Sequence, residues 1–463
     1  MLDVLGEKCG IVGVYGNKDL EASRLVLAGL WALQHRGQES SGISASDGNI
    51  IRTHTGSGLV AHVYDEKTLD SLPGYIAIGH NRYSTSGGST AKHNQPVTNS
   101  NNAIALGHNG NLPSVVKLQE FLASKKISIE DRNDSELMFD ALQYYVSEGS
   151  SIEDAVKQAY PLFTGVFCLV VMTVDKLIAI RDEYGIRPLS VGKLQDGYMV
   201  ASETCALSTV NAIEVRDVKP GEMIVIDESG LRSVQISESK NKLDIFEFVY
   251  FARPDSALLG KRVNEVRRNL GKELAKEFKI KADVVIPVPD SAIPAALGYA
   301  QASGVPFDHG FIKNRYIHRT FIRPVQKIRE NDVHMKLNPL EEVLKGKSVV
   351  VIDDSIVRGT TSKKLVDLLR SAGAKEVHML ISSPPIKYPD FYGIDTPDQK
   401  DLIASHMSVE EIRDLIDADF LGFLSYEGMI KATGVSEDLF STSCFTGVYP
   451  LDILERMKEI KKV

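Results

Sequence analysis

The sequence predicts an α+β domain with layered sheets, followed by an α/β domain whose sheet is mainly parallel. The chain has 463 residues, which is more than a single core of about 100–200 residues accommodates. Short apolar runs between glycine turns dominate the first half, whereas helices and strands alternate after residue 245. The segment 233–244 between the halves is polar and has no clear period, so we expect the domain junction there.

Short apolar runs in the first half have the composition of β-strands. Helical spacing occurs at Leu27, Leu30 and Trp31, which follow one another at i, i+3 and i+4, and again after Asp134. Strands therefore outnumber helices, which favours layered sheets over a doubly wound sheet. The strand-like runs are 9–16, 74–82, 102–111, 165–173, 176–185 and 222–230.

The second half alternates helix and strand, the pattern of β-α units around a parallel sheet. The predicted helices are 263–278, 292–302 and 360–374, and the predicted strands are 282–289, 347–354 and 376–383. No internal repeat relates the two halves of the sequence, so we expect them to carry different chemistry. The predicted domains are 9–235 and 245–463, the second ending in a helical extension.

Composition excludes several classes of protein. A net charge of -8 argues against a nucleic-acid-binding surface, which needs a concentrated basic face. The sequence has no apolar run near the roughly 20 residues that span a bilayer, and its start lacks the features of a signal peptide. The four cysteines, Cys9, Cys168, Cys205 and Cys444, form no CxxC pair. These features predict a cytoplasmic protein in a reducing compartment.

The most informative segment is VVVIDDSIVRGTTS at 349–362. Its apolar start predicts a buried parallel strand, and open α/β sheets bind ligands at the carboxyl ends of such strands. Asp353 and Asp354 stand at that end, where carboxylates can accept hydrogen bonds from ribose hydroxyls and anchor hydrated magnesium. The turn 359–362 leads into a helix, so its N–H groups and hydroxyls can surround a phosphate. Taken separately, the acidic pair could be a solvated strand end and the turn a helix cap.

The whole run resembles the loop that binds phosphoribosyl pyrophosphate (PRPP) in type I phosphoribosyltransferases. A second loop, PVPDSAIPAA at 287–296, also joins a strand to a helix. Between them, KNRYIHRTFIRP at 313–324 is basic and aromatic, and the resemblance implies a flap that excludes water. The implied PRPP-binding residues are Asp290, Ser291, Lys313, Tyr316, Arg319, Asp353, Asp354, Ser355, Arg358, Gly359, Thr360, Thr361 and Ser362, with Ser291, Asp353 and Asp354 beside the metal ion.

Cys9 begins the predicted strand CGIVGV, which offers no general base to activate an internal thiol. If residues 1–8 were removed as a propeptide, Cys9 would gain a free α-amino group, whose ordinary pKa is about 8. That amine could deprotonate its own thiol, directly or through water. A lone cysteine is otherwise a small buried hydrophobe, which we expect for Cys168 and Cys205.

Three motifs accompany Cys9: LQHRGQES at 33–40, HNRYSTSG at 80–87 and GHNGN at 107–111. With CGIVGV they resemble the N-terminal-nucleophile glutamine amidotransferases over nearly all of 9–235, which implies a four-layer αββα domain. The resemblance implies that Arg82 binds the α-carboxylate of glutamine and Asp134 its α-ammonium. It also implies an oxyanion hole formed by Asn109 and the Gly110 N–H, with Arg36 shaping the wall near Cys9.

Together the resemblances cover essentially the whole chain and imply a glutamine-dependent phosphoribosyltransferase. Glutamine would be hydrolysed at Cys9, and ammonia would pass internally to PRPP, because ammonia released into water at neutral pH is protonated. The implied products are 5-phosphoribosylamine, glutamate and pyrophosphate, in the first step of de novo purine biosynthesis. The resemblance further implies magnesium with PRPP, inhibition by purine nucleotides, and a homotetramer or homodimer, without nucleic-acid or membrane partners.

Relatives with a leader peptide often bind a [4Fe-4S] cluster through four cysteines. The matching positions here are Asp244, Asp390, Ser441 and Cys444. Because such clusters need thiolate ligands, we expect no iron-sulfur cluster, while a hard cation in this pocket stays a minor alternative.

Two other functions are compatible with parts of the sequence. An amidotransferase with another acceptor, such as a sugar-phosphate isomerising synthase or asparagine synthetase, would share the first domain but not the PRPP loop. A PRPP-sensing regulatory protein without catalysis would share the second domain. Its nucleic-acid-binding module and basic face are not visible in the sequence.

Overall fold

The computed structural model describes residues 9–83, 93–99, 103–314, 336–392, 398–451 and 453. The chain forms two compact units, and the division falls between Asp244 and Ile245. The N-terminal unit also includes the short segments that begin at Phe391 and Tyr449, and the C-terminal unit holds the rest of the chain up to Val448. Among the described residues, no helix is both long enough and apolar enough to cross a bilayer.

The first sheet of the N-terminal unit has seven antiparallel strands in the order β11-β9-β10-β1-β4-β2-β3. Its outer face packs against α1 (Ala22–Ala32) and α7 (Thr204–Thr209), where Val26 and Leu30 meet Val12 and Val14. Trp31 lies outside this contact, 53% exposed, although its spacing matches that of Leu27 and Leu30. The strands are β1 (Gly10–Gly16), β2 (Ser40–Ser46), β3 (Ile51–Ser57), β4 (Ile76–Arg82), β9 (Ser190–Leu194), β10 (Gly197–Ala201) and β11 (Ile213–Asp217).

The second sheet has six antiparallel strands in the order β13-β12-β8-β7-β6-β5. Leu137, Phe139 and Leu142 of one helix pack on its outer face with Leu169 and Val171 of β7. Its elements are β5 (Val97–Thr98), β6 (Ala105–Ser114), β7 (Thr164–Met172), β8 (Leu177–Arg181), β12 (Glu222–Asp227) and β13 (Gly230–Gln235), with helices α4 (Val116–Ser124), α5 (Asp134–Ser147) and α6 (Ile152–Ala159).

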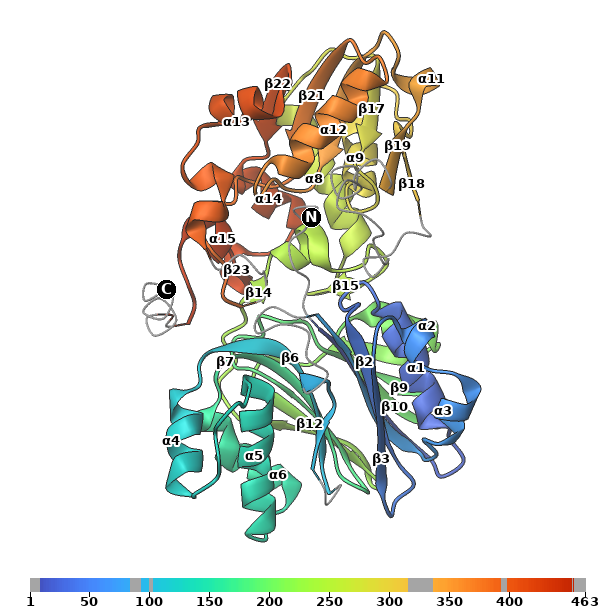
Figure 1. Ribbon diagram of the computed structural model, residues 1–463, viewed down its shortest axis with the longest axis vertical. Helices are drawn as coiled ribbons and strands as arrows, with labels where there is room; N and C mark the ends of the chain where they lie inside the picture. The colour runs from blue at the N-terminus through green and yellow to red at the C-terminus, as the bar shows by residue number, and fades with distance from the viewer. Residues whose placement is uncertain are drawn as a thin grey trace. The chain divides into compact units, whose positions relative to one another are not determined.

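A separate apolar core fills the space between these two sheets. Ile11 and Ile78 contribute to it from the first sheet, and Val170 and Ile224 from the second. Each sheet is therefore covered by the other sheet on one face and by helices on the opposite face (Figure 1). This arrangement confirms the predicted four-layer αββα architecture.

The C-terminal unit is built on a four-stranded parallel sheet, β17-β20-β21-β22, as predicted. Val349 and Val351 of β20 pack toward α12, whereas Val350 and Ile352 belong to the opposite face, where α9 contacts the sheet. Both faces are covered, which explains the uninterrupted apolar run of this strand. The strands are β17 (Val284–Pro287), β20 (Ser348–Asp353), β21 (Glu376–Ile381) and β22 (Phe420–Phe423).

Helices α8 and α9 of this unit pack backbone to backbone. A Cβ added to Gly271 would lie 1.8 Å from the carbonyl oxygen of Ala295, and one on Gly298 would lie 1.9 Å from that of Arg268. Only glycine permits so close an approach at these two positions.

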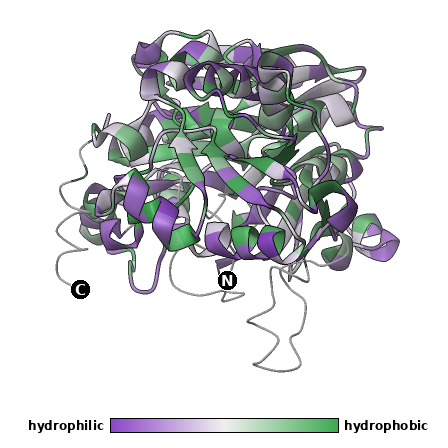
Figure 2. Cartoon of the chain, turned by 90° about the horizontal axis from the view of Figure 1, so that it is seen from above, coloured by the Kyte–Doolittle hydropathy of each residue, from purple (hydrophilic) through white to green (hydrophobic). Residues whose placement is uncertain are grey.

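Figure 2 shows mostly green strands at the centre and mixed purple and green helices around them. The helices are α8 (Val263–Glu277), α9 (Ile293–Ser303), α12 (Thr360–Ser371), α13 (Val409–Ile416) and α14 (Tyr426–Thr433).

The remaining elements are short. Two antiparallel pairs, β15 (Ala257–Leu258) with β16 (Lys261–Arg262) and β18 (Phe311–Lys313) with β19 (Leu337–Pro339), extend the C-terminal unit. The others are α2 (Val60–Val63), α3 (Glu66–Asp70), β14 (Leu243–Asp244), α11 (Glu341–Leu344), β23 (Phe440–Ser441) and α15 (Ser443–Thr446), with the short helices η2 (Tyr160–Leu162), η3 (Glu247–Phe251), η5 (Gln399–Asp401), η6 (Ile403–Ser405) and η7 (Glu437–Leu439). Residues 454–463, the end of the domain that was predicted to finish in a helical extension, lie outside the described residues.

Candidate active sites

Cys9 lies directly before β1 and is half-buried. In the antiparallel ladder, Gly10 pairs with Asn81 of β4, so continuing the register by one residue sets Cys9 opposite Arg82. A Cβ on Gly10 would lie 3.6 Å from Cβ of Arg36, so the HRG turn runs past the start of the strand. Three of the predicted glutamine-site residues thus converge on one end of the first sheet.

Asn109 approaches the same end from the second sheet. It lies on β6 and is fully buried. Its Nδ2 is 3.4 Å from Oγ of Ser202, and that Oγ accepts a 3.0 Å hydrogen bond from the backbone N–H of Ile11. The predicted oxyanion residue is therefore linked through one serine to the strand that begins at Cys9.

Arg36 is held in place by a buried carboxylate. Arg36 is 1% exposed and its Nε donates to Oε1 of Glu203, which is fully buried. Oε1 of Glu203 also lies 2.7 Å from Nε2 of His35. One carboxylate thus fixes two neighbouring side chains of the HRG turn, because an unpaired buried charge would be strongly destabilising.

Asp134 is the first residue of α5, whose N-terminus carries a capping box between Asn133 and Glu136. Oδ1 of Asp134 accepts from the N–H of Ser135 at 2.8 Å, and Oδ2 accepts from the N–H of Leu112 at 3.3 Å. Leu112 lies two residues beyond Gly110 on β6. The helix cap and the strand together bring this carboxylate beside the predicted oxyanion hole.

The histidines of the two motifs are buried. Burial lowers the pKa of His80 to about 3, and its Nε2–H donates to the carbonyl of His108 at 3.1 Å. Nδ1 of His108 is 2.9 Å from Oγ of Ser135. His80 is thus a neutral cross-link between β4 and β6, the strands that carry Arg82 and Asn109.

The other two cysteines of this unit are buried, as predicted. Cys168 is fully buried in the core between the sheets, and burial raises the pKa of its thiol to about 12. Cys205 is 2% exposed. A thiol that resists ionisation is a poor nucleophile, so Cys168 cannot take the role proposed for Cys9.

In the C-terminal unit, Asp353 ends β20 and Asp354 follows it, each 8% exposed. Burial, and then the charge of Asp354, hold the pKa of Asp353 well above its ordinary value, and burial also raises the pKa of Asp354. Oγ of Ser291 donates to one carboxylate oxygen of Asp354, and Oγ of Ser355 donates to the other at 2.7 Å. The two predicted PRPP loops therefore meet at Asp354.

The run then turns into α12 through Gly359, whose φ is +78°. This left-handed conformation favours glycine because a side chain would strain the backbone there. Thr360, Thr361 and Ser362 form the first turn of α12, where helical N–H groups lack intrahelical acceptors. Arg358, just before the glycine, donates to Asp401 at 3.0 Å. The turn has the geometry of a phosphate cradle.

Two more predicted PRPP residues lie at the neighbouring strand. Nζ of Lys313, at the end of β18, is 2.6 Å from Oδ2 of Asp290. Asp290 is 61% exposed in its side chain and follows β17, next to Ser291. Tyr316 and Arg319 lie outside the described residues.

The donor atoms of Asp353, Asp354 and Ser291 are all oxygens, the ligands that magnesium prefers. A nearby cation would also favour ionisation of the two carboxyl groups whose pKa values are raised.

The four positions matched to cluster cysteines contain a single thiol, Cys444, which is 1% exposed. Oδ2 of Asp390 accepts from Oγ of Ser443, and Asp244 lies 3.8 Å from Arg187. These oxygen-rich positions do not supply the thiolates of an iron-sulfur site.

Sequence reasoning missed three residues that hold the predicted ones: Ser202, Glu203 and Asp401. Ser202 and Glu203 form a polar pair directly after the apolar strand 197–201. Their position at the end of a strand could have identified them as candidate functional residues. Asp401 lies in a short 3-10 helix remote in sequence from Arg358, and nothing in the pattern links the two.

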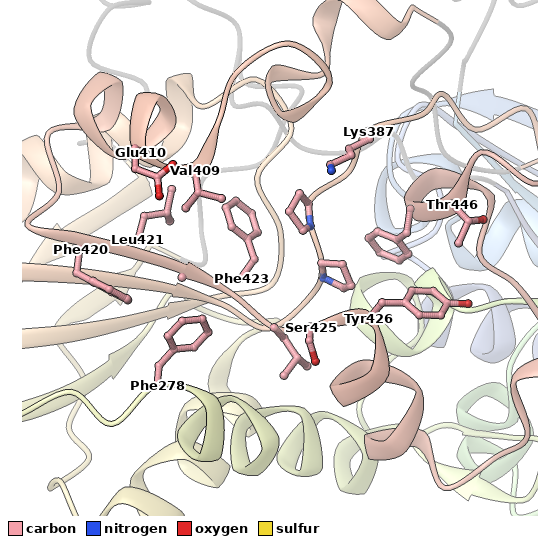
Figure 3. A pocket seen from close by; sticks show the side chains of 15 residues that line it. Phe278, Lys387, Val409, Glu410, Phe420, Leu421, Phe423, Ser425, Tyr426 and Thr446 are labelled. Carbon is pink, nitrogen blue, oxygen red and sulfur yellow. The ribbon is translucent and has the colours of Figure 1, made fainter.

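A pocket of about 670 Å³ opens elsewhere in the C-terminal unit, beside β22. Figure 3 shows Phe278, Phe420, Phe423 and Tyr426 around it, with Lys387 and Glu410 at its margin. None of the predicted PRPP residues lines it. This pocket is therefore separate from the predicted PRPP loops.

Comparisons with known proteins agree with both halves. The family model of a glutamine amidotransferase domain matches residues 80–209, and that of a phosphoribosyl transferase domain matches 258–384. The chain is 46% identical to an amidophosphoribosyltransferase of Synechococcus elongatus, covering 98% of this chain and 94% of that protein. It is 45% identical to the Bacillus subtilis enzyme of the same name, covering 97% and 96%.

Solved structures give the same result in three dimensions. The structure titled glutamine PRPP amidotransferase from B. subtilis complexed with ADP and GMP superposes with a TM-score of 0.89 at 44% identity, covering 96% of this chain and 98% of that one. A structure titled the allosteric regulatory enzyme of purine biosynthesis gives 0.90 at 45% identity, covering 96% and 97%.

The fold and the two sites define a glutamine-dependent phosphoribosyltransferase, with an N-terminal-nucleophile amidotransferase unit and a phosphoribosyltransferase unit. More narrowly, the chain belongs to the amidophosphoribosyltransferase family. It is an enzyme that transfers the amide nitrogen of glutamine to PRPP in the first step of purine biosynthesis. This membership sets aside a non-catalytic PRPP sensor and an amidotransferase with another acceptor.

Proposed function

We propose that Cys9, exposed as the N-terminal residue by removal of 1–8, is the nucleophile that opens the glutamine amide. The observation that carries the proposal is the convergence of Cys9, Arg82 and Asn109 on one end of the facing sheets. The free amine takes the thiol proton and the thiolate attacks the amide carbon. The resulting ammonium then returns that proton to the amide nitrogen, so ammonia leaves as the C–N bond breaks. Water then releases glutamate from the thioester.

Glutamine is oriented by its two charged ends. Arg82 pairs with the α-carboxylate, because a guanidinium matches a carboxylate with two parallel hydrogen bonds. Asp134 accepts from the α-ammonium, and its orientation is supported by the N–H groups of Ser135 and Leu112. Arg36 lines the wall beside Cys9, supported by Glu203. Holding both ends limits the amide carbon to one approach to the thiolate.

The negative oxygen that forms in each tetrahedral intermediate is stabilised by Asn109 Nδ2 and the Gly110 N–H. Asn109 is fully buried, so its dipole acts in a low-dielectric environment. Ammonia then passes internally to the second site, where it attacks C1 of PRPP as pyrophosphate leaves. Exclusion of water keeps ammonia unprotonated and protects the cationic ribosyl group.

PRPP binds across the two loops of the C-terminal unit. The first turn of α12, with Thr360, Thr361 and Ser362, receives the 5-phosphate. Asp353 and Asp354 accept from the ribose hydroxyls, and the loop with Asp290 and Ser291 lies beside the pyrophosphate. Magnesium, held through Asp353, Asp354 and Ser291, would neutralise charge on the pyrophosphate leaving group. The basic side chains of the set are Lys313, Arg319 and Arg358, and Tyr316, Ser355 and Gly359 complete it.

Regulation and assembly follow the same family pattern. We propose that purine nucleotides inhibit the enzyme, supported by the B. subtilis structure, which is described as a complex with ADP and GMP. We also propose a cytoplasmic homotetramer or homodimer and no iron-sulfur cluster, the latter because only one of four matching positions is a cysteine.

The decisive variant is Cys9→Ala, assayed with glutamine and with high ammonium. We expect glutamine-dependent synthesis to fall by at least about 10³-fold, as when other catalytic nucleophiles are removed, while ammonia-dependent synthesis persists. Cys168→Ala is the matched control, since it removes a buried thiol that takes no part. Mass spectrometry of the active enzyme should find Cys9 at the N-terminus. Retained glutaminase activity in Cys9→Ala, or a leader still attached to the active enzyme, would refute the mechanism.

A further inference from the structure

Three strands of the N-terminal unit meet at the side chain of Ser202. The residue follows β10 and is fully buried. Its backbone N–H donates to the carbonyl of Ile11 at 3.0 Å, and its Oγ accepts from the N–H of Ile11 at 3.0 Å. From the other side, Nδ2 of Asn109 on β6 lies 3.4 Å from the same Oγ. Ser202 therefore joins the strand that begins at Cys9 to the proposed oxyanion residue.

The hydrogen-bonding capacity of this cluster defines how the amide of Asn109 is oriented. Oδ1 of Asn109 is buried and has no hydrogen-bond partner among the described residues, while the hydroxyl hydrogen of Ser202 is not used when Oγ only accepts. Turning the amide by 180° about its last side-chain bond solves both problems, because Ser202 then donates to Oδ1. The orientation of an amide is assigned from its hydrogen-bond network, and this network favours the turned amide.

In that orientation both hydrogens of Nδ2 point away from Ser202. A buried amide that could rotate would also present its oxygen to the forming oxyanion, and an oxygen lone pair would repel that charge. A fixed donor instead costs no reorganisation during the reaction. The serine hydroxyl is suited to this task because it can accept from Ile11 and donate to Asn109 at once.

We propose that Ser202 is a positioning residue that locks the Asn109 amide with its nitrogen toward the reacting amide of glutamine. This inference rests on the proposed role of Asn109 in the oxyanion hole. Ser202 acts through Asn109 and through the start of β1, and it has no role in the binding of the glutamine α-carboxylate or α-ammonium. Its loss therefore affects the rate of the chemical step and leaves glutamine affinity unchanged.

The test compares steady-state glutaminase kinetics of Ser202→Ala, Ser202→Thr, Asn109→Ala and the double variant Ser202→Ala/Asn109→Ala. We expect Ser202→Ala to lower kcat for glutamine about 10-fold with KM unchanged, less than the about 10²–10³-fold of removing an oxyanion donor. Ser202→Thr restores the hydroxyl and should recover kcat even if its extra methyl group lowers stability. In the Asn109→Ala background, Ser202→Ala should reduce kcat no further.

Ser44→Ala is the matched control. Ser44 is fully buried in the same sheet, and its Oγ lies 2.7 Å from Thr53 Oγ1, so the variant also loses a buried hydroxyl but has no link to Asn109. Its kcat per folded molecule should equal that of the parent enzyme, and ammonia-dependent synthesis should be unchanged in Ser44→Ala and Ser202→Ala alike.

The outcomes distinguish the oxyanion role of Asn109 from the positioning role of Ser202. An unchanged kcat in Asn109→Ala would overturn the oxyanion role itself and this inference with it. A large effect of Asn109→Ala combined with no effect of Ser202→Ala, or with fully additive effects of the two changes, would overturn the positioning role alone. A fall in kcat for Ser44→Ala equal to that of Ser202→Ala would mean that any buried hydroxyl of the sheet matters, which also contradicts the proposal.

Discussion

The two sites of this enzyme differ in how far apart their residues lie along the chain. The proposed PRPP site draws most of its residues from one run, 349–362, at a single strand-to-helix turn. The proposed glutamine site combines residues from Cys9 to Asp134, supported by Ser202 and Glu203, on two facing sheets. A local turn can thus form a phosphate cradle, whereas an oxyanion hole needs distant strands.

The difference also extends to electrostatics. The glutamine site is surrounded by buried groups that stay paired or neutral, such as the Arg36–Glu203 pair and His80. The PRPP site instead holds two adjacent carboxyl groups whose pKa values are raised by burial and, for Asp353, by its neighbour's charge. In the proposed mechanism, the glutamine site would therefore need no added ion, whereas a cation bound with PRPP would balance the two carboxyl groups of the second site.

On the PRPP side of this comparison, the largest effect should come from Asp353→Asn and Asp354→Asn. Each exchanges a charged acceptor for a neutral amide at the ribose, so we expect synthesis from both glutamine and ammonia to fall about 100-fold. Basal glutaminase activity, measured without PRPP, should persist. Asp367→Asn, on the exposed side of α12, is the control. Equal loss of basal glutaminase would contradict the separation of the two sites.

The same variants should differ from the parent enzyme in stability. A raised folded-state pKa means that the carboxyl group contributes stability at low pH, which is lost as pH rises through that pKa. At neutral pH, burial of the ionised carboxylate of Asp353 destabilises the folded protein, and Asp353→Asn removes that cost. We therefore expect a higher unfolding temperature for this variant without ligand, an effect that disappears at acid pH.

A smaller effect should follow from Gly359→Ala. The left-handed φ of +78° costs a non-glycine residue about 1–2 kcal/mol, and the new Cβ would lie 3.0 Å from Ile403 Cδ1. Displacement of the first turn of α12 should raise KM for PRPP about 5-fold to 10-fold, measured by initial rates with ammonia.

Gly373→Ala is the control for strain at the other end of the same helix, since Gly373 has φ +87°. It should lose comparable stability while KM for PRPP stays at the parent value. A similar rise in KM for both variants would mean that helix stability, and not the geometry of the cradle, determines PRPP affinity.

The last prediction concerns pH and the glutamine site, and it bears on stability and not on catalysis. The pKa of His80 falls from 6.5 to about 3 on folding. Below about pH 6.5 the unfolded chain therefore binds a proton that the folded protein does not bind. The free energy of unfolding decreases as the pH falls through this range. The slope is about 1.4 kcal/mol per pH unit. His80→Gln should flatten the curve of unfolding free energy between about pH 6.5 and pH 4, followed by urea titration. The exposed His62→Gln should leave the curve as steep as in the parent enzyme.

Local patterns in the sequence predicted much of the fold. The run 349–362 predicted a buried strand, an acidic strand end and a helix, and β20 and α12 lie where expected. The strand β22 was not predicted, because short segments such as Phe420–Phe423 lack a distinguishing period. For the region after it, the sequence predicted a helical extension but no individual helix. Trp31 matched the apolar spacing of α1 yet is exposed, since packing and not periodicity decides which side of a helix is covered.

The sequence by itself determined the class of each unit. It also predicted the turn 359–362 as a phosphate site and, through family resemblance, Cys9 as the nucleophile, because each of these predictions rests on short motifs. Only the tertiary structure decided what supports the glutamine site. The contacts of Ser202 with Ile11 and Asn109, and of Glu203 with Arg36, join residues separated by 93 to 191 positions. Such contacts arise when strands pair and sheets pack, and no local pattern of residues records them.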